Sequence, residues 1–147
     1  MIVLAVMLAA ALLQPPGAAR AAQPTTTAPA MRTIDKGDHS NMDDAAQVVA
    51  KTEQEWQQLW QKHTPDRPRP AVDFSKEMVV GLFLGSRPTA GYILEIVSAV
   101  QDDGSLVVKY RESIPQRGSM TAQVLTSPYH VVAVPFFPGG VKFEKTP

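Results

Sequence analysis

A chain of 147 residues has room for one domain, and its 44% content of apolar residues is enough to bury a core. The 14 basic and 14 acidic residues balance, which argues against a nucleic-acid-binding domain. Cysteine is absent, which excludes disulfides, cysteine nucleophiles and thiolate metal sites, and 13 prolines argue against an all-helical fold.

Residues 1–21 are predicted to be a signal peptide. An apolar run from Met1 to Leu13 is shorter than the roughly 20 residues needed to span a bilayer. The breaker "QPPG" follows, and "ARAA" then supplies an A-x-A cleavage site near Ala21. No Lys or Arg precedes the apolar run, so an uncleaved tail or membrane anchor remains the alternative. We expect the chain to be exported, to the periplasm, the cell surface or the medium.

Residues 22–31, "AQPTTTAPAM", carry no charge and no periodicity, which predicts a disordered linker. The folded domain is therefore predicted to span residues 32–147. Its first strand is expected in "RTIDKG", residues 32–37, and a second in "AAQVVAK", residues 45–51. The polar stretch "DHSNMDD" between them is typical of a loop.

One helix is predicted, from about residue 53 to residue 63. Thr52 and Glu55 have the T-x-x-E spacing of a capping box, in which each side chain caps the other's backbone N–H. Pro65 and Pro68 prevent the helix from continuing. The residues that recur on one helical face, and are expected to pack against the sheet, are Trp56, Leu59, Trp60 and His63.

The remainder of the chain indicates a sheet. The segment "DDG", residues 102–104, joins two β-branched runs, which is a strong hairpin signal. The predicted fold is α+β: five to seven mainly antiparallel strands in a β sandwich or half-open barrel, with one short helix. The strands expected after the helix are "EMVVGLFLG", "YILEIVSAVQ", "SLVVKYRESI", "YHVVAVPFF" and "VKFEK".

The segment "GSRPTAGY", residues 85–92 and here called the Arg87 loop, separates two of these strands. Pro88 suits the second position of a type I turn over Arg87 to Ala90, and Gly91 suits the positive φ that often follows. A plain connection explains these residues but not the others, and Arg and Tyr commonly carry binding energy at interfaces. The predicted protein-binding residues are Arg87, Pro88, Thr89, Gly91 and Tyr92.

A second long polar loop, residues 117–128, lies between later strands. In a small sheet domain we expect it to lie at the same end as the Arg87 loop, so that the two form one composite surface. Pro88 and Gly91 would restrict the free conformations of the Arg87 loop, which would reduce the entropy lost on contact with a partner.

Nothing in the sequence indicates an enzyme. The motifs G-x-S-x-G, H-E-x-x-H and the P-loop are absent, and no catalytic residue, cofactor or small-molecule substrate is predicted. His63 is expected to pack at the helix C-terminus, and His130 to be structural or exposed at an edge. His39 lies in a loop with several Asp residues, and its spacing does not fit an EF-hand, so a solvated loop is preferred to a metal site. Trp56 and Trp60 could line a sugar site, but their helical spacing favours the core.

Three segments together resemble the C-terminal domain of PrcB, an accessory subunit of a bacterial surface protease complex. They are "EQEWQQLWQKH", "VDFSKEMVVGLFLGSRPTAGYILEI" and "LTSPYHVVAVP", in that order, and the resemblance covers residues 34–144. It implies a non-enzymatic protein that associates with a partner protein, with an exported protease as the expected partner, and stabilises it.

The Arg87 loop is also similar to the N-P-T-T-G-Y loop of chagasin-type inhibitors of cysteine proteases. Arg87 replaces the Asn of that motif, Ala90 replaces its second Thr, and the R-P-W segment of those inhibitors is not found. This similarity implies an alternative function, in which the Arg87 loop enters a protease cleft.

Overall fold

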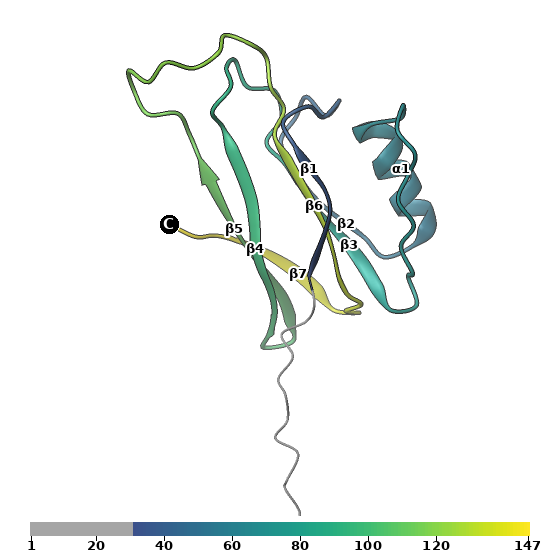
Figure 1. Cartoon of the computed structure of the whole chain (residues 1–147). Coiled ribbons are helices and arrows are strands. Elements are labelled where there is room, and N and C mark those ends of the chain that lie inside the picture. Colours follow the sequence, from purple (N-terminus) through teal and green to yellow (C-terminus); the bar gives the residue numbers. More distant parts are fainter. Residues whose placement is uncertain (1–30) are drawn as a thin grey trace, which may run out of the picture.

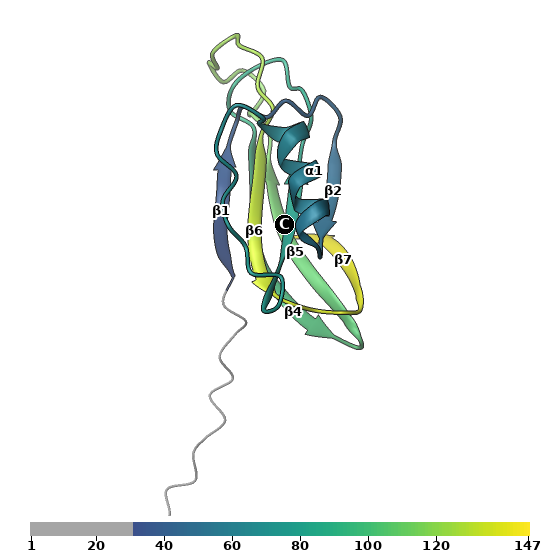
Figure 2. The ribbon, with the colours of Figure 1, turned by 90° about the vertical axis from the view of Figure 1, so that its right-hand side faces the viewer.

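The computed structural model describes residues 31–147. The predicted signal peptide (1–21) and residues 22–30 of the predicted linker therefore lie outside the described residues. Within the described part, two sheets and one short helix form an α+β sandwich (Figures 1 and 2). This confirms the predicted fold class.

The elements follow the predicted order along the chain. The helix is α1 (Glu53–His63), and the strands are β1 (Arg32–Gly37), β2 (Ala46–Ala50), β3 (Glu77–Phe83), β4 (Ile93–Asp102), β5 (Ser105–Ser113), β6 (Tyr129–Pro135) and β7 (Gly140–Lys145).

The first sheet has the strand order β1-β6-β3-β2, and all of its pairs are antiparallel. Its central strands β3 and β6 are buried on both faces, which explains why "MVVGLF" and "YHVVAV" are continuous apolar runs rather than alternating patterns. Val79 and Val131 face the helix, whereas Val80 and Val132 face the second sheet.

The second sheet has the order β4-β5-β7. The predicted hairpin between β4 and β5 is confirmed: Asp103 and Gly104 both have positive φ, 47° and 77°, as a type I′ turn requires. The pair β5–β7 is parallel, whereas the other pairs of strands named here for residues 31–147 are antiparallel. β7 can pair in this sense because it follows β6, which belongs to the other sheet.

Helix α1 covers the outer face of the first sheet (Figures 1 and 2) and has the predicted bounds. The Thr52 hydroxyl accepts the Glu55 N–H at 3.2 Å, but Glu55 reaches back to the N–H of Lys51, one residue before the expected partner. Trp56 and Trp60 are buried against the sheet, and each indole N–H donates to a backbone carbonyl of the following loop. No helix within residues 31–147 has the length and apolar character needed to cross a bilayer.

Candidate functional site

The Arg87 loop joins β3 to β4 at one end of the sandwich (Figure 1). It begins at Gly85, whose φ of +75° turns the chain against the backbone of residues 43–45. Ser86 then fixes this arrangement, because its N–H donates to the Asp43 carbonyl at 2.8 Å and its hydroxyl donates to the Asp43 carboxylate at 3.0 Å. The start of the loop is thus held by the segment that precedes β2.

The middle of the Arg87 loop is bonded to the connection between β5 and β6, residues 114–128, here called the Thr126 loop. Arg87 and Thr126 exchange two backbone hydrogen bonds of 2.7 and 3.0 Å, and the Thr126 hydroxyl donates to the Thr89 carbonyl at 2.9 Å. The two loops also lie together at one end of the molecule in Figure 1. The expected composite surface is therefore formed.

The predicted turn over Arg87 to Ala90 is not closed by its own hydrogen bond. The Ala90 N–H donates to the Ala122 carbonyl at 3.0 Å, while the Arg87 carbonyl accepts from Thr126. Gly91 does adopt the expected positive φ, +95°. The loop is thus held by contacts with a distant segment, and not by proline and glycine alone.

The five predicted binding residues lie together but are not equally accessible. Pro88 and Gly91 are exposed, while Arg87, Thr89 and Tyr92 are half-buried. The Arg87 guanidinium lies 5.7 Å from the centre of the Tyr92 ring, and Tyr92 in turn packs against the core between the sheets. Thr89 donates to the adjacent Ala90 carbonyl at 3.0 Å. Their role in binding stays a prediction.

Large apolar side chains surround this end of the molecule, and the motif-based reading of the sequence did not identify them. Several are strongly exposed, for example Ile114 at 68% and Leu125 at 76%. The sequence did contain a signal for these exposed side chains. Apolar residues that stand within or beside a polar loop have no core to fill, so they are expected to be exposed. The exposed set in and beside the two loops comprises Ile93, Ile114, Met120, Val124 and Leu125.

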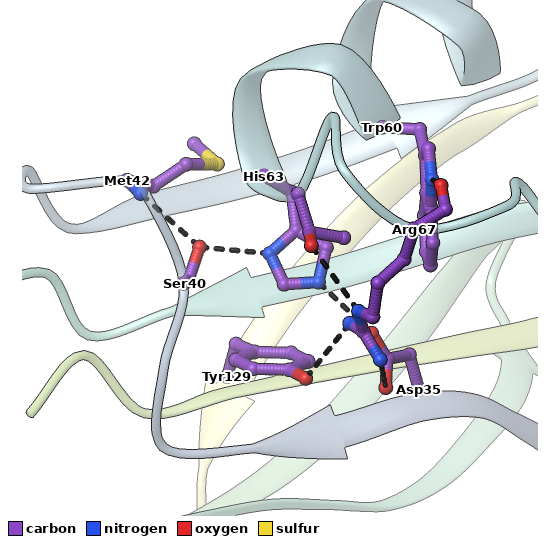
Figure 3. Close-up of polar contacts among 8 residues, drawn as sticks. Asp35, Ser40, Met42, Trp60, His63, Arg67 and Tyr129 are labelled. Carbon is purple, nitrogen blue, oxygen red and sulfur yellow. Dashed lines mark hydrogen bonds and ion pairs between the residues drawn. The ribbon is translucent and has the colours of Figure 1, made fainter.

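A polar cluster lies under α1 (Figure 3). It adjoins the Thr126 loop, because the Ser40 N–H donates to the Ser127 carbonyl at 3.2 Å. His63 is 1% exposed, and its Nε2 lies 3.0 Å from the Asp35 carboxylate while its Nδ1 lies 2.8 Å from the Ser40 hydroxyl. Because a carboxylate can only accept, Nε2 carries the proton and Nδ1 accepts from Ser40. Arg67 also donates to Asp35 and to the Tyr129 hydroxyl.

Burial disfavours the charged imidazolium and lowers the pKa of His63, an effect that Asp35 only partly offsets. Burial alone would raise the pKa of Asp35, but the hydrogen bonds from Arg67 and His63 outweigh it, so this pKa lies below its ordinary value. The stable arrangement is a neutral histidine beside an ionised aspartate.

This cluster contains a serine, a histidine and an aspartate, and no local pattern in the sequence predicts that these three residues lie together. Its geometry is not that of a hydrolase. Ser40 contacts Nδ1 and already accepts the Met42 N–H at 3.1 Å, and the imidazole that would act as base is buried. The cluster holds the loop after β1 to the C-terminal end of α1, which confirms His63 as a packed residue of that end.

His130 is also structural, and it joins the two sheets. Its Nδ1 accepts the Ile96 N–H of β4 at 2.8 Å, and its Nε2 donates to the Thr33 hydroxyl of β1 at 2.9 Å. Burial lowers the pKa of His130 to about 4, with a further contribution from Lys36. His130 is thus held as the neutral ring, with both nitrogens bonded.

The remaining histidine, His39, is exposed next to Asp38. Within residues 31–147, no group of three or more acidic or histidine side chains is placed to hold a metal ion. The two polar clusters around His63 and His130 thus account for the buried histidines, and the exposed end with the two loops remains the candidate site.

Comparison with known proteins relates part of this chain to a protein family. Neither the curated proteins nor the solved structures contain a match to this chain. The family model described as PrcB C-terminal matches residues 78–135, from the second residue of β3 to the end of β6 and including the whole Arg87 loop. Over this segment the resemblance to the PrcB C-terminal family is therefore confirmed.

Proposed function

We propose that this chain is an exported, non-enzymatic protein-binding domain that serves as an accessory and stabilising subunit of a protease complex. The match to the PrcB C-terminal family supports a domain associated with a protease complex. The proposed contact is the Arg87 loop together with the Thr126 loop beside it.

The observation that carries the proposal is the way in which these two loops are held. Backbone pairing between Arg87 and Thr126 fixes the loop on the frame of β3 and β6, so little conformational entropy remains to be lost on contact. Exposed apolar side chains such as Ile114 and Leu125 flank this frame. A rigid surface with exposed apolar groups is typical of a protein-binding site.

Loss of the two polar side chains of the Arg87 loop should weaken partner binding. We expect the double substitution Arg87→Ala and Thr89→Ala to reduce capture of a protease at least tenfold, because Arg and hydrogen-bonding groups at interface centres carry much of the affinity. The measurement is the amount of protease recovered with the tagged chain from the extracytoplasmic fraction, quantified by mass spectrometry.

The matched control is Gln58→Ala with Lys62→Ala, which removes two exposed polar side chains from α1 on the outer face of the first sheet. Both doubles should retain the thermal stability of the parent to within about 0.5 kcal/mol, as surface substitutions usually do. Equal recovery of protease with both doubles would contradict the proposal. If the pure domain instead blocks a papain-like protease in a direct assay, the inhibitor alternative is favoured.

Export is a separate part of the proposal. Mass spectrometry of the N-terminus should find a mature chain that begins near Ala22, if cleavage follows the "ARAA" sequence. An intact N-terminus in the membrane fraction would indicate a retained anchor, and a cytoplasmic chain would contradict export.

A further inference from the structure

The two sheets are closed along one side and open along the other. On the closed side the Ile96 N–H of β4 bonds to His130, and Lys36 of β1 pairs with Glu95 of β4. On the other side β2 is the outer strand of the first sheet. There, Lys51 donates to the carbonyl of Gly139 at 2.9 Å and closes only one end of the gap. The other end, toward the Arg87 loop, contains a cleft of about 500 Å³.

The cleft has an apolar floor and a polar rim. Leu82, Leu84 and Leu94 contribute the floor, and they come from both sheets. Gln47 of β2 is exposed and lies on the strand face of Val49, which packs toward the second sheet, so its side chain is directed to the cleft. The volume falls within the roughly 300–1,000 Å³ range of sites that bind ligands.

One wall of the cleft is a strand edge that β7 does not cover. The ladder between β5 and β7 ends at Tyr110, whose carbonyl accepts the Thr146 N–H at 2.7 Å. Backbone groups of alternate residues point to the same edge of a strand. The N–H and C=O of Glu112 therefore point to the edge of β5 on which β7 pairs, but they lie beyond the end of the β5–β7 ladder. Figure 1 shows β5 continuing past the end of β7 toward the loops. Among residues 31–147 no strand pairs with Glu112 on this edge.

The two charged side chains at the rim differ in whether they have an ion-pair partner. The Glu112 carboxylate is paired with Lys145 at 3.1 Å, so its charge is already compensated. Arg87 also lines the cleft, but within residues 31–147 no carboxylate lies within ion-pair distance of it. Among the described residues, its guanidinium donates only to the Ser86 carbonyl, at 3.2 Å, and it lies over the Tyr92 ring. The cleft is therefore complementary to a carboxylate.

We propose that the cleft binds an extended, acidic segment of a partner polypeptide by strand addition to the free edge of β5. The segment pairs with the backbone of Glu112, places an aliphatic side chain over the leucine floor, and directs an Asp or Glu side chain to Arg87. This inference rests on the proposed protein-binding function and adds the chemistry of the segment that is bound.

The test is a phage-displayed library of random heptapeptides selected on the purified chain. We expect enriched peptides to carry Asp or Glu beside Val, Ile or Leu. A selected peptide, synthesised with both ends capped, should bind in a fluorescence anisotropy titration. Affinity should fall at least tenfold when the Asp or Glu of the peptide is replaced by Asn or Gln. A loss of at least tenfold is also expected when N-methylation of the backbone amides on one edge of the peptide blocks strand pairing.

Substitutions in the chain locate the site. Gln47→Trp fills the cleft and should weaken peptide binding at least tenfold, whereas Gln57→Trp on the exposed face of α1 should leave it unchanged. Gln47→Glu serves as a second variant if the Trp variant does not fold. It adds a negative charge to the cleft that Arg87 also lines, and Gln57→Glu is its control.

Three results would overturn the inference: no selected peptides, selected peptides without an acid, or equal binding by the Gln47 variants and the parent. In these cases, protease recovery that still depends on Arg87 and Thr89 would show that the loop function stands without the cleft. Recovery that does not depend on them would mean that the proposed function itself has failed.

Discussion

Replacing Gly85 with alanine is expected to lower the free energy of unfolding by about 3 kcal/mol. The φ of +75° at this position costs about 1–2 kcal/mol for a residue with a Cβ atom. The added Cβ would also lie 2.6 Å from the Asp43 carbonyl oxygen and 2.7 Å from the Ala45 nitrogen. These are backbone atoms that cannot rotate away, and overpacking of this kind typically adds about 1–3 kcal/mol.

Gly118→Ala is the matched control for this effect. Gly118 has a similar φ of +83°, but a Cβ built there meets nothing within 4 Å. Its replacement should therefore cost only the conformational part, about 1–2 kcal/mol. Urea unfolding of both variants separates the two contributions. Equal losses for the two variants would show that the segment before β2 yields to the added methyl group.

The expected loss at Gly85 concerns the candidate site as well as stability. Ser86 is bonded twice to Asp43, and Arg87 follows it directly. A shift of the segment before β2 would therefore displace the backbone that pairs with Thr126. We expect Gly85→Ala to weaken protease recovery together with stability, in contrast to the Arg87 and Thr89 substitutions, which leave stability unchanged.

The order of the secondary-structure elements could be predicted because each has a strong local signal. The spacing of Thr52 and Glu55 marks the start of α1, and the Asp-Gly pair at Gly104 marks the β4–β5 hairpin. The pairing of strands is a different matter. The parallel pair β5–β7 depends on β7 crossing to the other sheet, and "VKFEK" carries no sign of its neighbour.

The bend at the candidate site could be predicted from the sequence, but the hydrogen bonds that hold this bend could not. Pro88 and Gly91 indicated a bend, yet the hydrogen bonds of the bend go to Thr126 and Ala122, which are more than 30 residues away in the chain. The same limit applies under α1, where His63 meets Asp35 from 28 residues away. Pairings between distant polar residues depend on strand register, which local patterns do not encode.

Acidification from pH 7 to pH 4 is expected to remove about 3 kcal/mol of stability through His130 alone. Above pH 6.5, the ordinary histidine value, neither the native nor the unfolded state binds a proton at this ring. Between pH 6.5 and about 4 the unfolded state binds one and the native state does not, because the pKa of His130 is lowered to about 4 by burial. The stabilisation is therefore present above pH 6.5 and is lost as the pH falls toward 4.

His63 acts in the same direction, since burial lowers its pKa as well. The charged groups that face it are Asp35 and Arg67, and those that influence His130 are Lys36 and Glu95. Carboxylates with lowered pKa values, such as Asp35, lose their contribution only as the pH falls below the ordinary carboxyl range. The interval from pH 6.5 to pH 5 therefore reports mainly on the two buried histidines.

Urea unfolding at several pH values tests this account. The free energy of unfolding should fall by about 1 kcal/mol per pH unit through His130 between pH 6 and pH 5, and the lowered pKa of His63 should add to this fall. His130→Gln keeps an amide that can accept from Ile96 and donate to Thr33 but cannot titrate, so this variant should lose about 1 kcal/mol per pH unit of that slope. If His130→Gln keeps the parent slope, His130 is not held neutral in the native state, and its hydrogen bond to Ile96 is not what joins the sheets.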